Sequence, residues 1–378
     1  MSSTGWWRAR TARVPMRIAA CGIAAALAAA AAGCGAVESH APAAAHSGAA
    51  NDGKPPSVYL LNAYVQDTFW QGCSKGAKQA AGDLGVTDYT ELDGNNSSQT
   101  QAGQIDTAIE KKPDAILIAA LDSKAVVPAL TAARKQGIKV YAFNTAVPDA
   151  HLDGTVAMDE VATGAAAARQ MIALAQKRGL KQLKVLHLVG AVATEPVRLR
   201  RQGFDDQMAK PVPGLKISVT DKVTDWKPEK AVSALEDTLT RQKIDAIFTE
   251  SDFLTPFLVP VLKREGFKPQ PGRRPIIGGL GGIPGGFKAI RDGWQDFTLN
   301  YQIDGMCDAA MRFAAAAKQG KAFGAVAQQV GRDANLAEAK PKVVENAAQG
   351  PSMLLTATLV TKANVDDPDL WANKLTGG

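Results

Sequence analysis

The sequence predicts an α/β protein made of two halves of similar plan, each a parallel sheet flanked by helices. From Val58 onward, short apolar runs alternate with stretches of helical periodicity, which is the pattern of βαβ units. This alternation of strand and helix patterns occurs twice along the chain. A length of 378 residues is also sufficient for two domains with separate cores.

The first 33 residues have the pattern of a bacterial export signal. Four arginines precede an apolar, alanine-rich run from Ile18 to Gly33, which is too short and too weakly apolar to span a membrane. The run ends at Cys34 and resembles a lipoprotein signal, although Ala31 stands where the pattern prefers leucine. We expect lipidation of Cys34, with ordinary cleavage among the alanines as the alternative. Residues 34–57 are small, polar and Pro-containing, as in a flexible tether.

The charge balance gives no indication of a nucleic-acid partner. The formal net charge is +6, but four of the 43 basic residues lie in the signal and none of the 37 acidic residues does. The mature chain therefore carries a formal charge of +2. A chain so close to neutrality lacks the basic surface that polyanion binding needs.

The elements of the first half follow in a regular order. Strand patterns and helix patterns alternate, each typical in length and periodicity. The expected strands cover 58–63, 86–93, 114–120 and 139–145, and the expected helices cover 70–85, 99–112 and 123–137.

The second half repeats this order. The expected helices cover 164–179, 195–210, 227–242 and 253–266, and the expected strands cover 184–190, 215–221, 245–251 and 275–280. Open parallel sheets bind ligands at the carboxyl ends of their strands. The residues just after each strand are therefore the first candidates for a site.

A serine in the first helix matches the G-x-S-x-G nucleophile elbow of hydrolases. Ser74 lies in Gly72-Cys73-Ser74-Lys75-Gly76, but an elbow serine belongs on a sharp turn from strand to helix. The preceding strand ends more than ten residues earlier. His187 lies within a strand pattern and His151 after a turn, so the sequence presents no convincing nucleophile, base and acid.

Neither glycines nor cysteines indicate a cofactor or a metal. The stretch Gly278–Gly286 departs from G-x-G-x-x-G at Pro284, so a turn after a strand explains it better than a nucleotide site. No metal-binding spacing is present, and we expect no cofactor and no metal. Cys73 and Cys307 remain after the signal and Cys34, either as buried free thiols or as a disulfide in an exported protein.

The order of several segments resembles the type I periplasmic sugar-binding proteins, the ribose-binding-protein-like receptors of ABC importers. The resemblance covers about residues 58–371. The segments that carry it are "DTFWQGCSKGAKQAAGDLG", "DAILIAALDSKAVVPALTAARKQGIKVYAFNT", "VRLRRQGFDDQM", "TDWKPEKAVSALEDTL" and "LLTATLVTKANVDDPDLW". It implies two Rossmann-like lobes joined by a three-crossing hinge. Residues 323–350 have no clear counterpart.

The resemblance also implies a division of the chain. The first lobe would comprise 58–157 and 302–325, and the second lobe 158–301 and 326–371, followed by a tail at 372–378. The family's first and last helices run side by side, which would bring Cys73 and Cys307 together and makes a disulfide possible within the spacing that such a bond requires.

Ligand contacts can be assigned by matching positions to the family pattern. Phe69, Trp70 and Trp226 would stack on the faces of a sugar, and polar side chains would bind its hydroxyls. The positions that the resemblance assigns to the ligand are Asp67, Phe69, Trp70, Asn144, Arg200, Trp226, Ser251 and Gln302. Tyr301 is the alternative to Gln302, because the alignment there is ambiguous.

Two departures from the family pattern bear on the ligand. Asn144 and Leu280 stand where the pentose-binding pattern has acidic residues. Ribose is therefore doubtful, and a less hydroxylated or differently shaped solute fits the pattern better.

The sequence thus predicts a monomeric, non-enzymatic binding protein of the periplasm or cell envelope. It would capture a sugar or polyol and deliver it to an ABC permease. The protein would be attached to the membrane only through the lipid on Cys34. A sensor for a chemoreceptor or kinase is the alternative. A LacI-like regulator shares the fold but would carry a helix-turn-helix in place of the signal, and a hydrolase using Ser74 is the least favoured function.

Overall fold

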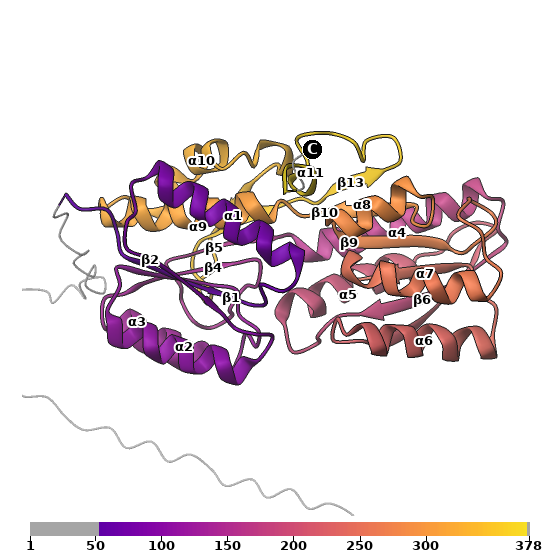
Figure 1. Ribbon diagram of the computed structural model, residues 1–378, viewed down its shortest axis with the longest axis horizontal. Coiled ribbons are helices and arrows are strands. Elements are labelled where there is room, and N and C mark those ends of the chain that lie inside the picture. The colour runs from indigo at the N-terminus through magenta and orange to yellow at the C-terminus, as the bar shows by residue number, and fades with distance from the viewer. Residues whose placement is uncertain (1–52, 376–378) are drawn as a thin grey trace, which may run out of the picture. The chain divides into compact units, whose positions relative to one another are not determined.

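The computed structural model describes residues 53–375 (Figure 1). The predicted signal peptide, Cys34 and nearly all of the predicted tether lie outside the described residues. Between Gly53 and Leu375, no helix is long and apolar enough to cross a membrane.

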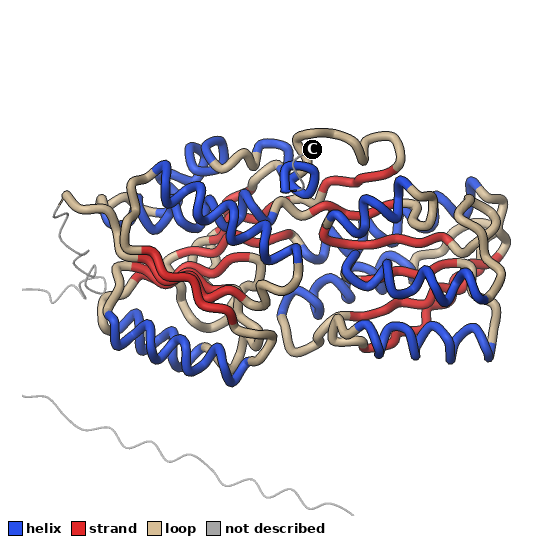
Figure 2. The backbone as a smooth tube through the Cα atoms, in the orientation of Figure 1, coloured by secondary structure: helices blue, strands red, loops and turns tan. Residues whose placement is uncertain are grey.

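Two sheets, each the centre of one lobe, dominate the architecture (Figure 2). The first has seven strands in the order β11-β12-β5-β4-β3-β1-β2, and the second has six in the order β13-β10-β9-β8-β6-β7. All neighbouring strands are parallel except β11 on β12 and β13 on β10. The prediction of two parallel α/β lobes is confirmed.

The first lobe begins with the expected alternation and is completed by segments from the end of the chain. Its early elements are β1 (Val58–Asn62), α1 (Thr68–Asp83), β2 (Tyr89–Asp93), α2 (Ser98–Lys111), β3 (Ala115–Ile118), α3 (Val127–Lys135), β4 (Lys139–Phe143) and β5 (Gly154–Met158). Its late elements are α9 (Ile303–Lys318), α10 (Phe323–Asp333), β11 (Lys342–Val344) and β12 (Ser352–Leu355).

The second lobe contains the middle of the chain and one late strand. Its elements are α4 (Glu160–Lys177), β6 (Gln182–Val189), α5 (Glu195–Met208), β7 (Lys216–Val223), α6 (Pro228–Arg241), β8 (Ala246–Thr249), α7 (Thr255–Arg264), β9 (Ile276–Gly281), α8 (Pro284–Arg291), β10 (Phe297–Asn300) and β13 (Thr358–Thr361). The short helix α11 (Trp371–Leu375) lies against α1.

The chain passes between the two sheets three times. The first crossing leads from β5 into α4, the second from β10 into α9, and the third from β12 into β13. The three crossings that the resemblance implied are therefore present.

The sheets place one segment differently from the sequence-based division of the chain. Residues 326–355 were assigned to the second lobe, but β12 pairs with β5 and β11 pairs with β12 in the first sheet. Helix α10 packs on α9 through stacked Phe313 and Phe323, whose ring centroids are 3.8 Å apart. Because β12 extends the first sheet beside β5, the third crossing comes only after Leu355.

Helices cover both faces of each sheet. In the first lobe, α2 and α3 lie on one face, and α1, α9 and α10 lie on the other (Figure 1). In the second lobe, the apolar cluster on one face is built with α6 and α7, and α4 and α5 pack on the opposite face. Alternate side chains of each buried strand can therefore contact helices on either side.

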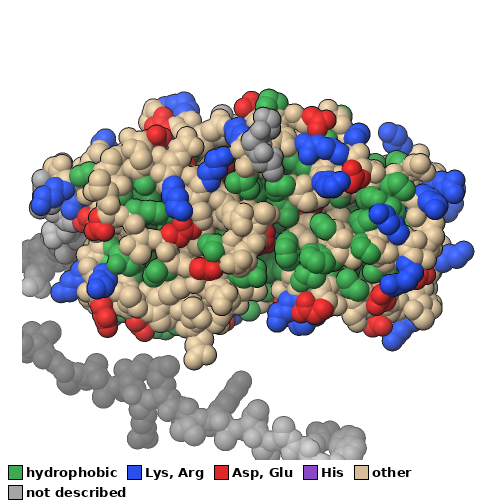
Figure 3. Space-filling model, in the orientation of Figure 1, with side chains coloured by type: hydrophobic (Ala, Val, Ile, Leu, Met, Phe, Trp, Pro, Cys, Tyr) green, Lys and Arg blue, Asp and Glu red, His purple; other side chains and the backbone are tan. Residues whose placement is uncertain are grey.

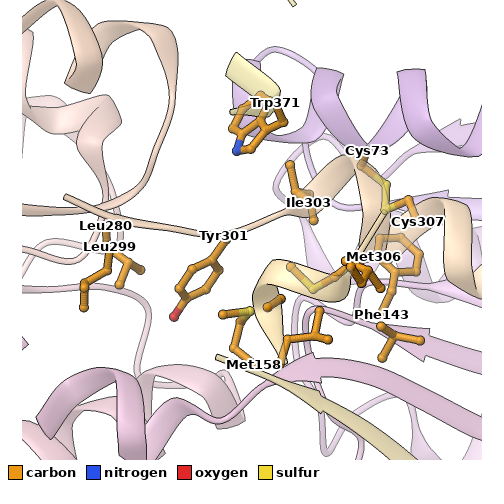
Figure 4. Close-up of a cluster of buried hydrophobic side chains, with 14 of the residues drawn as sticks. Cys73, Phe143, Met158, Leu280, Leu299, Tyr301, Ile303, Met306, Cys307 and Trp371 are labelled. Atoms are coloured by element: carbon orange, nitrogen blue, oxygen red, sulfur yellow. A yellow bond between two sulfur atoms is a disulfide. The ribbon is translucent and has the colours of Figure 1, made fainter. Parts of the chain in front are cut away.

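Helices α1 and α9 pack unusually closely, and two features of the sequence explain it. A β carbon at Gly76 would lie 2.0 Å from the carbonyl oxygen of Asp304, so only glycine permits the approach. Cys73 and Cys307 are bonded across the same interface, with 5.3 Å between their Cα atoms (Figure 4). Of the two states that the sequence left open for Cys73 and Cys307, the structure has the disulfide.

Candidate functional site

A cavity of about 120 Å³ lies between the two lobes at the carboxyl ends of the strands. Such a volume accommodates several water molecules or one small polar molecule. The first lobe lines it with Ala63, Tyr64, Asp67, Phe69, Trp70, Asn96, Leu121 and Asn144. The second lobe and the second crossing line it with Arg200, Trp226, Glu250, Ser251, Phe253, Leu280, Gly281, Ile283 and Tyr301.

Asp67 and the two aromatic residues after it form one wall. Asp67 is the N-cap of α1, and its Oδ1 accepts a hydrogen bond of 2.9 Å from the backbone of Phe69. Burial raises the pKa of Asp67 to about 6, although the Phe69 backbone hydrogen bond opposes the shift. The rings of Phe69 and Trp70 meet edge to face at 5.1 Å. The cap therefore fixes both a titratable acid and two apolar faces at the cavity.

Asn144 follows β4 and has a left-handed backbone, with φ of 59°. Asparagine tolerates this conformation better than most residues. The backbone amide of Asn144 donates to the carbonyl of Val156 at 2.8 Å, which ties the turn to β5. The position that holds an acid in the family pattern therefore presents a neutral amide to the cavity.

Trp226 supplies an aromatic face from the second lobe. Its indole lies over Gly190, where a β carbon would be 2.5 Å from the ring. Its Nε1 donates to the carbonyl oxygen of Glu250 at 3.2 Å. Ser251 follows Glu250 at the end of β8 and caps the next turn by accepting from Phe253 at 3.2 Å.

Arg200 reaches the cavity from within a buried group of charges. Its Nε donates to Glu160 Oε2 at 2.9 Å, and one terminal nitrogen lies 3.5 Å from Glu250 Oε2. A β carbon at Gly164 would lie 1.9 Å from the Arg200 carbonyl oxygen, so α4 and α5 cross closely enough to bring Glu160 beside Arg200. Arg200, the one cationic side chain among the described residues that line the cavity, is thus held by two carboxylates.

The two carboxylates around Arg200 differ in their acidity. Burial raises the pKa of Glu160 despite the opposing charge of Arg200. Burial also acts to raise the pKa of Glu250, but Arg200, His187 and the Gly190 amide outweigh it and lower that pKa. The pKa shifts of the two carboxyl groups thus have opposite signs, and Glu160 makes the shorter of the two contacts with Arg200.

At the second crossing the structure favours Tyr301 over Gln302 as the residue that lines the cavity. Tyr301 lines the cavity, and its hydroxyl donates to Glu160 Oε2 at 2.6 Å. The Arg200 guanidinium lies 5.8 Å from the centre of its ring. Gln302 is not among the lining residues. The chain runs from Leu299 through Tyr301 to Ile303 in Figure 4, between side chains of the two lobes. Tyr301 thus replaces Gln302 as the candidate at this position.

The structure brings seven of the eight assigned residues to one cavity, with Gln302 as the exception. Sequence reasoning missed Glu160 and Glu250. Glu250 directly follows a strand, which is the available signal, whereas the neighbouring Ser251 matches a family position. Glu160 begins a helix after the first crossing, and nothing in its local pattern indicates burial.

The G-x-S-x-G match at Ser74 and the glycine-rich stretch Gly278–Gly286 both have structural roles. The Ser74 hydroxyl is bonded to the carbonyl of Trp70 and to Glu91 within α1 and β2, and Ser74 does not line the cavity. In the stretch Gly278–Gly286, glycines make room for buried Asp252, which accepts from the Gly282 amide at 2.9 Å. The glycines thus shape the cavity wall around Gly281 rather than a phosphate loop.

Comparison with known proteins agrees with this geometry. Residues 58–322 match the periplasmic binding protein domain. The chain is 29% identical over 201 residues to the xylitol-binding protein of Mycolicibacterium smegmatis, covering 53% of this chain but only 54% of that protein. It is 25% identical over 277 residues to the D-xylose-binding periplasmic protein of Escherichia coli, covering 72% and 77%.

Solved structures share the fold. A carbohydrate transporter solute-binding protein from Agrobacterium radiobacter, in complex with D-arabinose, superposes with a TM-score of 0.69 at 20% identity. The superposition covers 84% of this chain and 98% of that one. At this level of identity the likeness establishes the two-lobed architecture.

Proposed function

The chain belongs to the periplasmic binding protein domain family, and from this premise we propose that it captures a small neutral polar solute, a sugar or polyol, between its two lobes. The observation that carries the proposal is the cavity between the lobes, which combines aromatic faces with a few convergent polar groups. Sugars and polyols present apolar C–H faces and hydroxyl edges, which need these two kinds of partner.

The charges at the cavity favour a neutral solute over an acidic one. Arg200 is already paired with Glu160 and Glu250, and Asp67 on the opposite wall adds a further carboxyl group. An anionic ligand would either displace these carboxylates from Arg200 or lie beside them. No unpaired cation among the described lining residues would then balance the charge of the ligand. Two relatives named for binding xylitol and D-xylose support five-carbon sugars and polyols as the first candidates.

Delivery to an ABC permease and a location in the periplasm or cell envelope are part of the proposal. Solute contacts from both lobes would stabilise a closed arrangement that a permease distinguishes from the open one. Export would use the signal at residues 1–33, with the protein acting as a monomer held by a lipid on Cys34. Fatty-acid labelling of wild-type and Cys34→Ala chains tests the anchor, since only the wild type should carry label.

A thermal-shift screen of the purified protein tests solute binding. D-xylose, xylitol, D-arabinose and glucuronate would be compared over a range of concentrations. A solute at 100 times its Kd should add about 2.7 kcal/mol to the unfolding free energy. We expect stabilisation by at least one neutral solute and none by glucuronate.

Variants of one aromatic residue inside the cavity and one outside it complete the test. Trp226→Ala should abolish the shift because the second-lobe stacking face is lost. Phe257→Ala is the matched control, since Phe257 is an exposed aromatic of the same lobe that does not line the cavity. Binding that survives Trp226→Ala would show that the cavity assigned here is not the solute site.

A further inference from the structure

A buried histidine lies between two carboxylates directly behind the solute cavity. His187 on β6 is 0% exposed. Its Nδ1 lies 3.1 Å from Asp221 Oδ1, and its Nε2 lies 3.3 Å from Glu250 Oε1. Phe204 and Phe248 pack against the ring, with centroids 4.6 and 5.2 Å away. The ring therefore has a carboxylate at each nitrogen and apolar contacts on its faces.

This arrangement determines the protonation state of the ring. An ionised carboxylate only accepts hydrogen bonds, and a neutral imidazole has one donor nitrogen and one acceptor nitrogen. Both contacts are satisfied only when both nitrogens donate, which is the imidazolium form. Burial lowers the pKa of His187, but hydrogen bonds and charges from Asp221 and Glu250 outweigh it and raise that pKa overall.

Glu250 connects this histidine to two residues of the cavity. Its Oε2 accepts from the Gly190 amide at 2.9 Å and lies 3.5 Å from Arg200. Its backbone carbonyl accepts from the Trp226 indole at 3.2 Å. One residue thus holds both the guanidinium and the aromatic face that the second lobe presents to the cavity.

The charges around His187 alternate in sign from the buried ring toward the surface. Asp221 comes from β7, Glu250 follows β8, and Arg201 and Asp205 come from α5. Arg201 forms ion pairs with both Asp221 and Asp205. The Asp221 side chain is 22% exposed, which gives His187 a route for proton exchange. A neutral His187 would leave Glu250 or Asp221 facing a lone pair at about hydrogen-bond distance.

We propose that His187 is a positioning residue of the solute site: its imidazolium form holds Glu250, and through Glu250 it holds Arg200 and Trp226. The proposal rests on the proposed function only in that the positioned residues bind the solute. Loss of the proton in alkaline solution releases Glu250 and weakens binding. If the neutral form does not bind, the apparent Kd rises about tenfold for each pH unit above the His187 midpoint.

Nuclear magnetic resonance of the solute-free protein tests the protonation state directly. Histidine labelled with ¹³C at Cε1 would be titrated from about pH 5 to about pH 10, and the His187 signal would be assigned with His187→Gln. The Trp226 indole N–H resonance, assigned with Trp226→Phe, reports the Glu250 carbonyl. We expect His187 to remain cationic above the pH range in which an ordinary histidine loses its proton, and both signals to change with one midpoint.

Solute binding measured by calorimetry over the same pH range tests the consequence. D-xylose, xylitol and D-arabinose serve as probes for wild type, His187→Gln and the control His151→Gln, whose residue is exposed. Wild type and His151→Gln should share the alkaline loss of affinity. His187→Gln should bind weakly at every pH and show no alkaline step, because its amide does not titrate.

The outcomes separate this proposal from the proposed function. If none of the probes binds wild type at any pH, the proposed solute class fails, while the resonances still decide the state of His187. The proposal is overturned if His187 titrates at or below the ordinary pKa of histidine. It is also overturned if the Trp226 indole resonance does not change when His187 loses its proton. The resonances of wild type decide the matter even if His187→Gln does not fold.

Discussion

At the scale of single residues, Asp67 combines a structural and a binding role. It caps α1 and lines the cavity, and burial raises its pKa from 3.8 to about 6. The folded chain therefore holds this proton more tightly than the unfolded chain does. By linkage, the unfolding free energy falls as the pH rises from about 4 to about 6 and stays lower above that range. An ionised Asp67 thus reduces stability at neutral pH.

Asp67→Asn should separate these two roles. Asparagine caps helices as well as aspartate does, so we expect the solute-free variant to gain about 1–3 kcal/mol of unfolding free energy at pH 7. Solute binding should weaken about tenfold because a charged acceptor is lost. Urea denaturation and calorimetry would measure the two effects.

The matched control is Asp159→Asn, which changes the N-cap of α4, where Asp159 Oδ1 accepts from Ala162, and does not touch the cavity. It should leave the unfolding free energy within about 0.5 kcal/mol of wild type. A loss of stability in Asp67→Asn at pH 7 would contradict the assigned burial of the carboxyl group.

Residue identity alone predicts some of the site and not the rest. Trp226 and Arg200 could be assigned because they match a family pattern in position and chemistry. Glu160 and Glu250 could not, because charged residues are mostly exposed and their burial depends on partners that meet only in the fold. Glu160 is paired with Arg200, which is 40 residues away in sequence. The sequence places His187 within a strand pattern, but its two carboxylates come from β7 and from the residue after β8.

At the scale of elements, the α1–α9 interface holds the first and last parts of the first lobe together. The disulfide there spans 234 residues of sequence, and closing so long a loop stabilises the fold by about 5 kcal/mol in the chain-entropy description. Gly76 permits the helices to approach. Cys73, Cys307 and Gly76 therefore all stabilise or permit the same contact between α1 and α9.

Gly76→Ala should destabilise the protein. The new methyl group would meet the backbone of Asp304 at 2.0 Å, so we expect a loss of about 1–3 kcal/mol or more of unfolding free energy. Gly82→Ala in the same helix is the control, since no atom lies within 4 Å of its added β carbon. That change should add about 0.5–1 kcal/mol. Urea denaturation of both variants would measure the difference, and equal effects would show that the helices do not approach as described.

At the scale of the whole molecule, the two-lobed plan was predictable and one part of its connectivity was not. The alternation of strands and helices is a local signal, and it predicted both sheets. Strands β11 and β12 are three and four residues long, and they are far in sequence from the strand β5 that they extend. Such short strands carry little periodicity, so residues 326–355, the later part of the segment between the second and third crossings, were assigned to the wrong lobe.

Among the described residues, most of the buried side-chain polar atoms without a hydrogen-bond partner lie at the crossings between the lobes. Within residues 53–375, six buried side-chain atoms have no hydrogen-bond partner, and four of them belong to Glu160, Asn300 and Gln302 at the first two crossings. Asn300, the last residue of β10, is 1% exposed with neither its oxygen nor its nitrogen bonded. Burial of such a group costs free energy, so we infer that an arrangement of the lobes with solute bound satisfies it.

Asn300→Leu tests this inference. Leucine has a similar branched shape and removes both unpaired groups, so the solute-free protein should gain about 1–2 kcal/mol of unfolding free energy. The same change should weaken binding of the best solute from the screen severalfold, because the bound arrangement loses its polar partner. Gly82→Ala, which raises stability away from the crossings, should leave the affinity unchanged. A less stable Asn300→Leu protein would show instead that the amide is already satisfied without solute, as an internal water would achieve.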